Sequence, residues 1–280
     1  MAATFRYAVV DVFTDKALTG NQLAVFTDAT DIPEELLQPL AREMAFSETV
    51  FVYRPEGDGH VRIRIFTPSS ELPFAGHPVL GTAFVLAGPL QLVEIRLECG
   101  VGVVPVTLDR EGARIVFGWM AQPIPAWRPY EWAEELLAAI GVERSELPVE
   151  LYDLGPTHVF VKLGSADEVA ALTPDLGALA RFPVGVNCFA RSGRRWKTRV
   201  FAPAIGVSED PATGSAAGPL AVHLVRHGVV APGEEIEISQ GAEIGRPSTL
   251  FARADGSPDE IEHVAVGGSA VLVARGQFSL

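Results

Sequence analysis

One pattern of residues occurs twice, about half the chain apart, and this repeat constrains the fold more than any other feature. The first copy is Arg64-Ile65-Phe66-Thr67-Pro68, a polar loop, and an apolar segment that begins Pro73-Phe74-Ala75-Gly76-His77. The second copy is Arg199-Val200-Phe201-Ala202-Pro203, a loop, and Pro211-Ala212-Thr213-Gly214-Ser215. Each copy is typical of a β-branched and aromatic strand, a turn and a helix start. The sequence therefore predicts an internal duplication with two similar halves.

Further matches follow the same order in both halves. An alternating strand closed by glycine comes after each helix, at 93–100 and at 235–241. Before the first copy, the segment from Glu48 to Val52 matches the segment from Val186 to Ala190, and Gly20-Asn21 matches Gly155-Pro156. The duplication thus covers most of the chain.

A chain of 280 residues is long enough for two domains, each with its own core. We predict a first half at 1–120, a linker at 121–129 and a second half at 130–280, with the last strand able to cross back to the first half. Three prolines in the linker argue against regular structure there. The helices expected at 73–88 and 211–227 are apolar on nearly all sides, which indicates burial on all sides. The predicted fold class is α+β, with each half a β-barrel-like sheet rolled round a central helix.

Charge and cysteine content limit the partners and the compartment. The net charge of −13 argues against nucleic acid or an anionic membrane as a partner, because both are polyanions. No apolar run is long enough to span a membrane, and no charged-then-apolar leader opens the chain. Cys99 and Cys188 are far apart and form no disulfide framework. We therefore expect a cytoplasmic protein.

A glycine, Gly76 or Gly214, lies where the chain turns from loop into each predicted central helix. A residue without a side chain lets a ligand approach the first-turn N–H groups, where the helix dipole attracts an anion. If the halves face each other, both helix starts converge on one cleft and can hold a small carboxylate. The alternative is two ordinary buried helices in which glycine permits tight packing.

The two copies differ at positions that could carry catalysis. Glu48 corresponds to Val186, and His77 corresponds to Ser215. A partly buried carboxyl group, such as one between Ser47 and an apolar strand, has a raised pKa and can move protons near neutral pH. Glu48 could instead be a solvated loop acid, and His77 a first-turn residue that bonds a loop.

Asp210 lies before Pro211, where the first copy has Leu72 before Pro73. It could position a ligand or simply cap the helix, and the two roles are compatible. His223 and His227 have the spacing of metal ligands on a helix, but no third ligand is evident, so we predict no metal site.

Three motifs resemble the PhzF-like phenazine-biosynthesis isomerase family. They are Phe46-Ser47-Glu48, Pro73-Phe74-Ala75-Gly76-His77-Pro78 and the segment from Glu209 to Ala216. The resemblance runs the whole chain, from the Val10-Asp11-Val12-Phe13 opening to Val266-Gly267-Gly268. It implies a fold similar to diaminopimelate epimerase, an active site in the cleft between two halves, and a homodimer.

The resemblance also implies a reaction and roles for residues. In the phenazine enzyme the glutamate that matches Glu48 moves a proton on a cyclohexadiene carboxylic acid and gives a ketone without a cofactor. We therefore expect a cofactor-independent isomerase of a small unsaturated carboxylic acid, with Glu48 as general acid/base. By the same resemblance the other catalytic residues are His77, Asp210 and Ser215, and the substrate-binding residues are Ser47, Gly76, Thr213 and Gly214.

Two other functions stay open. One is an epimerase or racemase of a small amino or hydroxy acid. Epimerases of this fold use one thiol from each half, and this chain has Ala75 and Thr213 at the matching positions, which argues against a two-thiol mechanism. The other is a binding protein for small acids that does no chemistry.

Overall fold

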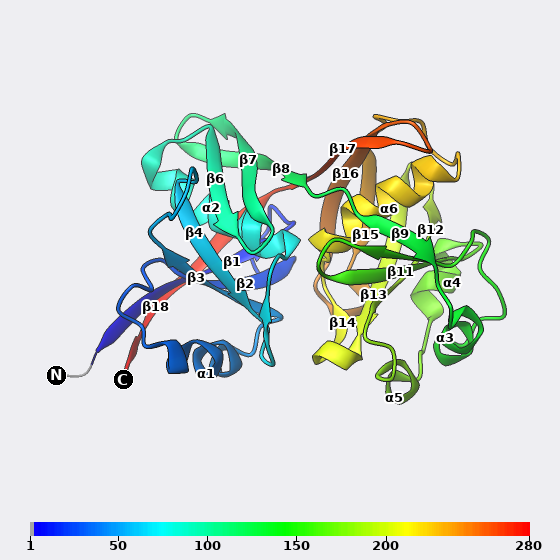
Figure 1. Cartoon of the computed structure of the whole chain (residues 1–280), viewed down its shortest axis with the longest axis horizontal. Coiled ribbons are helices and arrows are strands. Elements are labelled where there is room, and N and C mark those ends of the chain that lie inside the picture. The colour runs from blue at the N-terminus through cyan, green and yellow to red at the C-terminus, as the bar shows by residue number, and fades with distance from the viewer. Residues whose placement is uncertain (1–2) are drawn as a thin grey trace. The chain divides into compact units, whose positions relative to one another are not determined.

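Residues 3–280 are described by the computed structural model, in which the chain forms two units with separate hydrophobic cores. Unit 1 comprises Met1–Ala121 and Gly267–Leu280, and unit 2 comprises Gln122–Val266. Strands predominate over helices in both units, so the fold is a mixed α and β fold (Figure 1). Within residues 3–280, none of the helices is long and apolar enough to span a membrane.

Unit 1 contains two α-helices, α1 (Glu34–Met44) and α2 (Gly76–Leu90). Its strands are β1 (Thr4–Val12), β2 (Asn21–Phe26), β3 (Glu48–Tyr53), β4 (Val61–Phe66), β5 (Glu71–Leu72), β6 (Glu94–Cys99), β7 (Gly102–Glu111), β8 (Arg114–Gln122) and β18 (Ala270–Ser279).

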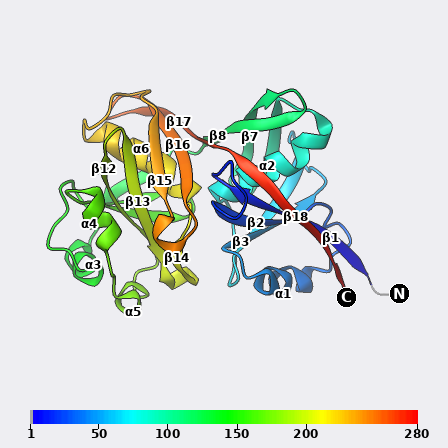
Figure 2. The same ribbon diagram turned by 180° about the vertical axis from the view of Figure 1, so that it is seen from behind.

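The sheet of unit 1 curves round α2. Neighbouring strands follow the order β18, β1, β2, β3, β4, β6, β7 and β8, with parallel pairs at β2–β3 and β4–β6. Strand β18 lies beside β1 as an antiparallel partner (Figure 2). Helix α2 contacts strands from both ends of this series, including β1, β2, β6 and β7. Gly81 makes this packing possible, because a Cβ atom there would lie 2.7 Å from Leu23 and Val12.

Unit 2 contains α3 (Ala133–Ile140), α4 (Ala166–Ala171), α5 (Leu176–Leu179), α6 (Gly214–Arg226) and two 3₁₀ turns, η1 (Pro203–Ile205) and η2 (Ala242–Ile244). Its strands are β9 (Ala126–Pro129), β10 (Glu150–Asp153), β11 (Thr157–Lys162), β12 (Gly185–Ser192), β13 (Arg195–Ala202), β14 (Val207–Asp210), β15 (Ile236–Gln240), β16 (Ser248–Gly256) and β17 (Ile261–Gly268).

The pairings of unit 2 follow the order β9, β10, β11, β12, β13, β15 and β16, with parallel pairs at β11–β12 and β13–β15. A short strand, β14, also pairs with β13, as β5 pairs with β4 in unit 1. Helix α6 contacts β11 and β16, and all of its residues from Gly214 to Val225 are buried.

Both central helices begin later than predicted, at the glycine itself. Residue Ala75 is extended, with φ −154° and ψ 139°, and Thr213 is also non-helical, so the prolines at 73 and 211 lie outside the helices. Burial on all sides was also wrong for part of α2, because Phe84, Val85 and Leu86 are only half-buried. Gly76 and Gly214 therefore form the first helical residues, which places their N–H groups at the helix start.

The segment 121–129 is more regular than its prolines suggest. The strand β9 forms at Ala126–Pro129 and pairs with β10, so the expectation of irregular structure was wrong there. The ring of Pro129 is compatible with a strand because β9 stands at the end of the pairing order in unit 2, and proline is tolerated in edge strands.

The pairing register also corrects one match between the two copies. Phe66 pairs with Thr49 and Phe201 pairs with Val186, so the residue that corresponds to Glu48 is Gly185 and not Val186. Both Glu48 and Gly185 are the first residues of their strands. One copy thus has a carboxylate at the position where the other has no side chain.

Candidate active site

In unit 1, Glu48 and His77 form a close contact. Glu48 begins β3, and His77 is the second residue of α2. The Glu48 Oε2 and His77 Nε2 atoms are 3.4 Å apart, and the two side chains are 14% and 4% exposed. Because Glu48 stands on a strand and its side chain is largely buried, it is not the solvated loop acid that the sequence also allowed.

A second pair of polar residues supports this contact. Asn21, the first residue of β2, has its Nδ2 atom 3.3 Å from His77 Nδ1. Its Oδ1 atom accepts a 2.9 Å hydrogen bond from the hydroxyl of Ser47. Gly20 sets the turn before Asn21, with φ +70° and no room for a side chain beside Val12.

The His77 ring is neutral, because burial lowers its pKa from 6.5 to about 3. The Nδ1 atom lies within reach of the Asn21 side chain, and the direction of this contact follows the tautomer of the ring. The Nε2 atom faces Glu48. At 3.4 Å the two atoms are in close contact but farther apart than in an ordinary hydrogen bond.

In unit 2, Asp210 and Thr213 form a corner before α6. The Thr213 hydroxyl donates to Asp210 Oδ2 at 2.5 Å. The Gln240 side chain closes the corner from β15: its Nε2 atom donates to Asp210 O at 2.7 Å and to Thr213 Oγ1 at 2.9 Å. The N-cap residue of α6 is Thr213, so Asp210 is not the helix cap that the sequence allowed.

Ser215, the second residue of α6, has a partner on β11. Its Oγ atom is 2.9 Å from Nε2 of His158, and both side chains are buried. The carbonyl of Gly214 accepts a 3.0 Å hydrogen bond from Gln122 Nε2. Burial lowers the pKa of His158 from 6.5 to about 4, so this ring is also neutral at pH 7.

The two units thus share one kind of contact, although the strand residues that make it stand at different positions. The side chain that follows the helix-start glycine contacts a polar side chain from β2 or β11, as His77 with Asn21 and Ser215 with His158. Ser47, Glu48, Gly76 and His77 lie together in unit 1, and Asp210, Thr213, Gly214 and Ser215 lie together in unit 2.

Three supporting residues were not predicted: Asn21, His158 and Gln240. Asn21 belongs to a repeated Gly-x pair, which was the one sequence signal for it. His158 and Gln240 contact their partners over 57 and 27 residues of sequence, which no local pattern predicts.

A third polar cluster in unit 2 contains His223 and His227, with Glu150 as the group that the sequence left unidentified. Glu150 Oε2 accepts from His227 Nε2 at 3.0 Å and from Arg226 at 2.6 Å. Although burial opposes ionisation, hydrogen bonds from these neighbours hold the pKa of Glu150 far below its usual range. Because the Arg226 guanidinium already neutralises this carboxylate, the cluster is an ion-pair network.

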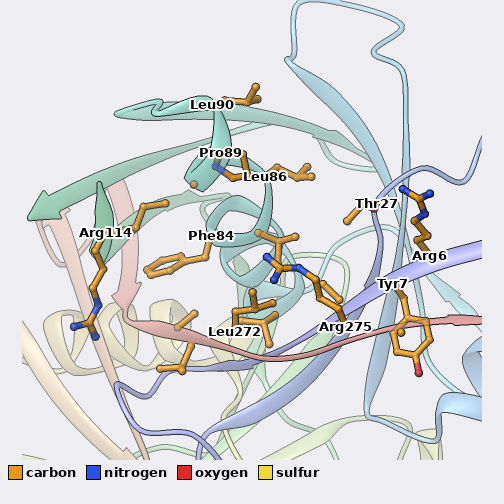
Figure 3. A pocket seen from close by; sticks show the side chains of 18 of the residues that line it. Arg6, Tyr7, Thr27, Phe84, Leu86, Pro89, Leu90, Arg114, Leu272 and Arg275 are labelled. Carbon is orange, nitrogen blue, oxygen red and sulfur yellow. The ribbon is translucent and has the colours of Figure 1, made fainter. Parts of the chain in front are cut away.

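A cavity of about 1010 Å³ opens in unit 1, away from all the predicted site residues. Figure 3 shows Arg114 toward one end and Arg6 toward the other, with Phe84, Leu272 and Arg275 between them. None of the described residues that line this cavity carries a carboxylate or an imidazole.

The cysteines lie outside both clusters. Cys188 is buried in the core of unit 2, and burial raises its pKa to about 12. Cys99 is partly buried at the end of β6, and burial raises its pKa too. Neither thiol is activated as a base, in agreement with Ala75 and Thr213 at the helix starts.

Comparison with known proteins gives relatives over the whole chain. A family model described as phenazine biosynthesis-like protein, PhzC-PhzF, matches residues 10–276. A trans-2,3-dihydro-3-hydroxyanthranilate isomerase from Pseudomonas aeruginosa is 50% identical over 276 residues, covering 98% of this chain and 99% of that one. These matches confirm the resemblance seen in the motifs.

Solved structures share the fold. A PhzF family protein from Bacillus anthracis has a TM-score of 0.87 at 24% identity, covering 99% of this chain and 100% of that one. A hydroxyproline epimerase from Agrobacterium vitis has a TM-score of 0.69 at 13% identity, covering 99% and 91%. The fold of this chain is therefore shared by a PhzF family protein and by an epimerase, so the fold alone does not identify the reaction.

Proposed function

Because the chain belongs to the phenazine biosynthesis-like PhzC-PhzF family and is an isomerase, we propose that it isomerises trans-2,3-dihydro-3-hydroxyanthranilate with Glu48 as general acid and base. The observation that carries this assignment is the buried contact between Glu48 and the neutral ring of His77. In this proposal His77 keeps the carboxylate in place for proton transfer.

In the proposed reaction Glu48 moves one carbon-bound proton of the substrate, and the later change from enol to ketone moves the hydroxyl proton to carbon. The hydrogen on the ring carbon that bears the hydroxyl is next to the remaining ring double bonds. Glu48 removes this proton, and the negative charge spreads through the conjugated ring toward the carboxylate. Glu48 then returns the proton to another ring carbon, which leaves an enol that becomes a ketone. No atom is gained or lost.

Binding the substrate carboxylate is the proposed role of Ser215, Thr213 and Gly214. A helix start offers backbone N–H groups and a positive dipole end to an anion, and it stabilises the charge that develops in the transition state. Asp210 is proposed to fix Thr213 and to orient the substrate amino group. In unit 1, Gly76 and Ser47 are proposed to complete the environment of the reacting carbon.

The test is turnover by Glu48→Gln in deuterium oxide. Glutamine keeps the size of the side chain but cannot accept a proton, so we expect kcat to fall about 10²- to 10⁴-fold. The rate at which deuterium enters the reprotonated carbon should fall by a similar factor.

Glu43→Gln is the matched control, because Glu43 is an exposed acid of α1 in the same unit. It should turn over at the parent rate. Parent-rate turnover by Glu48→Gln would show that another group moves the proton.

The predicted duplication is supported by the pairing order. In each unit an antiparallel pair, a parallel pair and another antiparallel pair precede the short strand, and a parallel pair follows the central helix. We propose that the two units are copies of one ancestral half. Superposing the two units in an experimentally determined structure would test this proposal. Corresponding strands that do not coincide would contradict it.

We also propose a homodimer in the cytoplasm. The family resemblance supports the homodimer, and two free cysteines support a reducing compartment. Cell fractionation tests the compartment, and the association state is treated in the Discussion.

A further inference from the structure

His158 is a buried histidine that the proposed reaction leaves without a role. It is 5% exposed, and it stands at the second position of β11. Its Nε2 atom lies 2.9 Å from the hydroxyl oxygen of Ser215, which is 7% exposed at the first turn of α6. A polar ring held this deep against a predicted site residue requires an explanation.

Gly185 leaves the space that the His158 ring occupies. His158 and Gly185 are direct partners in the parallel pair β11–β12. A Cβ atom built on Gly185 would lie 2.6 Å from His158 Nδ1 and 3.1 Å from Cε1, so the ring occupies the space that any side chain would need. Gly185 is also the position that corresponds to Glu48 in the first copy. In unit 2, the imidazole replaces a carboxylate at this place.

The proton of the ring can be placed from its surroundings. The Nδ1 atom has no hydrogen-bond partner among residues 3–280. Because burial keeps the ring neutral, it has one N–H group. If that group were on Nδ1, a buried donor would be left unpaired, whereas an unpaired acceptor is the better tolerated defect. The proton is therefore on Nε2, and it is donated to Ser215 Oγ.

This donation determines what the serine can do. A hydroxyl has one proton to donate, and its oxygen accepts. With the oxygen accepting from His158, the Ser215 proton is free to point at a ligand. The start of α6 adds backbone N–H donors on the same side. A ligand group beside Ser215 therefore meets hydrogen-bond donors from the serine hydroxyl and from the start of α6.

We propose that His158 locks Ser215 as a hydrogen-bond donor, so that this corner of unit 2 selects a carboxylate over the corresponding neutral amide. Two carboxylate oxygens accept from these donors, and such charge-assisted bonds are the stronger kind. An amide would turn its NH₂ group toward donors and leave it unpaired. Without His158 the serine hydroxyl could rotate and accept from that NH₂ group. The inference rests on the proposed function for the identity of the ligand, and His158 is a positioning residue.

The experiment measures binding of two ligands that do not react. 3-Hydroxyanthranilate is the aromatic counterpart of the proposed substrate, and its primary amide differs only at the carboxylate. By calorimetry we expect the parent protein to prefer the carboxylate about ten- to hundredfold. His158→Phe should reduce this preference to about threefold or less. His158→Gln should recover most of it, because the glutamine amide can donate to Ser215.

The control is His263→Gln, an exposed histidine of β17, which should keep the full preference. If His158→Phe does not fold, Gly185→Ala provides the second variant, because its methyl group displaces the ring and should lower the preference in the same way.

An unchanged preference in a folded His158→Phe or Gly185→Ala protein would overturn the proposal, as would equal binding of both ligands by the parent protein. The measurement does not depend on turnover. A protein that selects the carboxylate but exchanges no deuterium would contradict the proposed reaction and leave this subsite supported.

Discussion

At the scale of single residues, His77 and His158 make stability depend on pH. Burial lowers their pKa values from 6.5 to about 3 and about 4, so the unfolded chain binds protons more readily than the folded protein. Their contribution is complete above pH 6.5 and is lost as pH falls toward the folded pKa values. Between pH 7.5 and 5 we expect a loss of about 2 kcal/mol for each histidine. Urea unfolding at several pH values measures it. His158→Gln should reduce the pH dependence of the free energy of unfolding, whereas substitution of an exposed histidine, His263→Gln, should leave it unchanged. The same pH dependence in the parent protein and in His158→Gln would contradict the prediction.

At the scale of elements, the packing of α6 depends on Gly218. A Cβ atom there would overlap Oε1 of Gln122 and lie 2.7 Å from Val264. Gly218→Ala must displace the side chain that holds the Gly214 carbonyl, so we expect the free energy of unfolding to fall by about 2 kcal/mol. Gly88 of α2 is the matched control, because nothing lies within 4 Å of its added Cβ. Gly88→Ala should stabilise by about 0.5–1 kcal/mol. Denaturant titration compares the two, and equal effects would show that the close approach at Gly218 is not limiting.

At the scale of the whole molecule, we expect association into a homodimer. Leu90 and Leu272, which line the unit 1 cavity, are 64% and 42% exposed, and uncovered apolar surface favours assembly. Two chains of net charge −13 repel each other, so added salt should strengthen the association. Sedimentation equilibrium should give twice the chain mass of 29.9 kDa. A mass of one chain at every protein and salt concentration would contradict the expectation.

Much of the fold could be predicted from local sequence. The strand and helix pattern before Gly76 and Gly214 is contained in short segments, because residue periodicity and glycine position act over a few neighbours. The motifs around Glu48 and Asp210 likewise identified residues that lie in two polar clusters. Local sequence was less reliable where pairing with a distant strand overrides a local preference. Pro129 is an example, because its strand forms when β10 supplies a partner.

The sequence by itself determined the alternation of strands and helices and the family, because these follow from the order of residue types along the chain. Only the tertiary structure decided which side chains meet. The partners of His77, Ser215 and Thr213 come from strands far away in sequence, and the neutral state of both histidines comes from burial by those strands. Desolvation and hydrogen-bond geometry depend on three-dimensional neighbours, which no local pattern encodes.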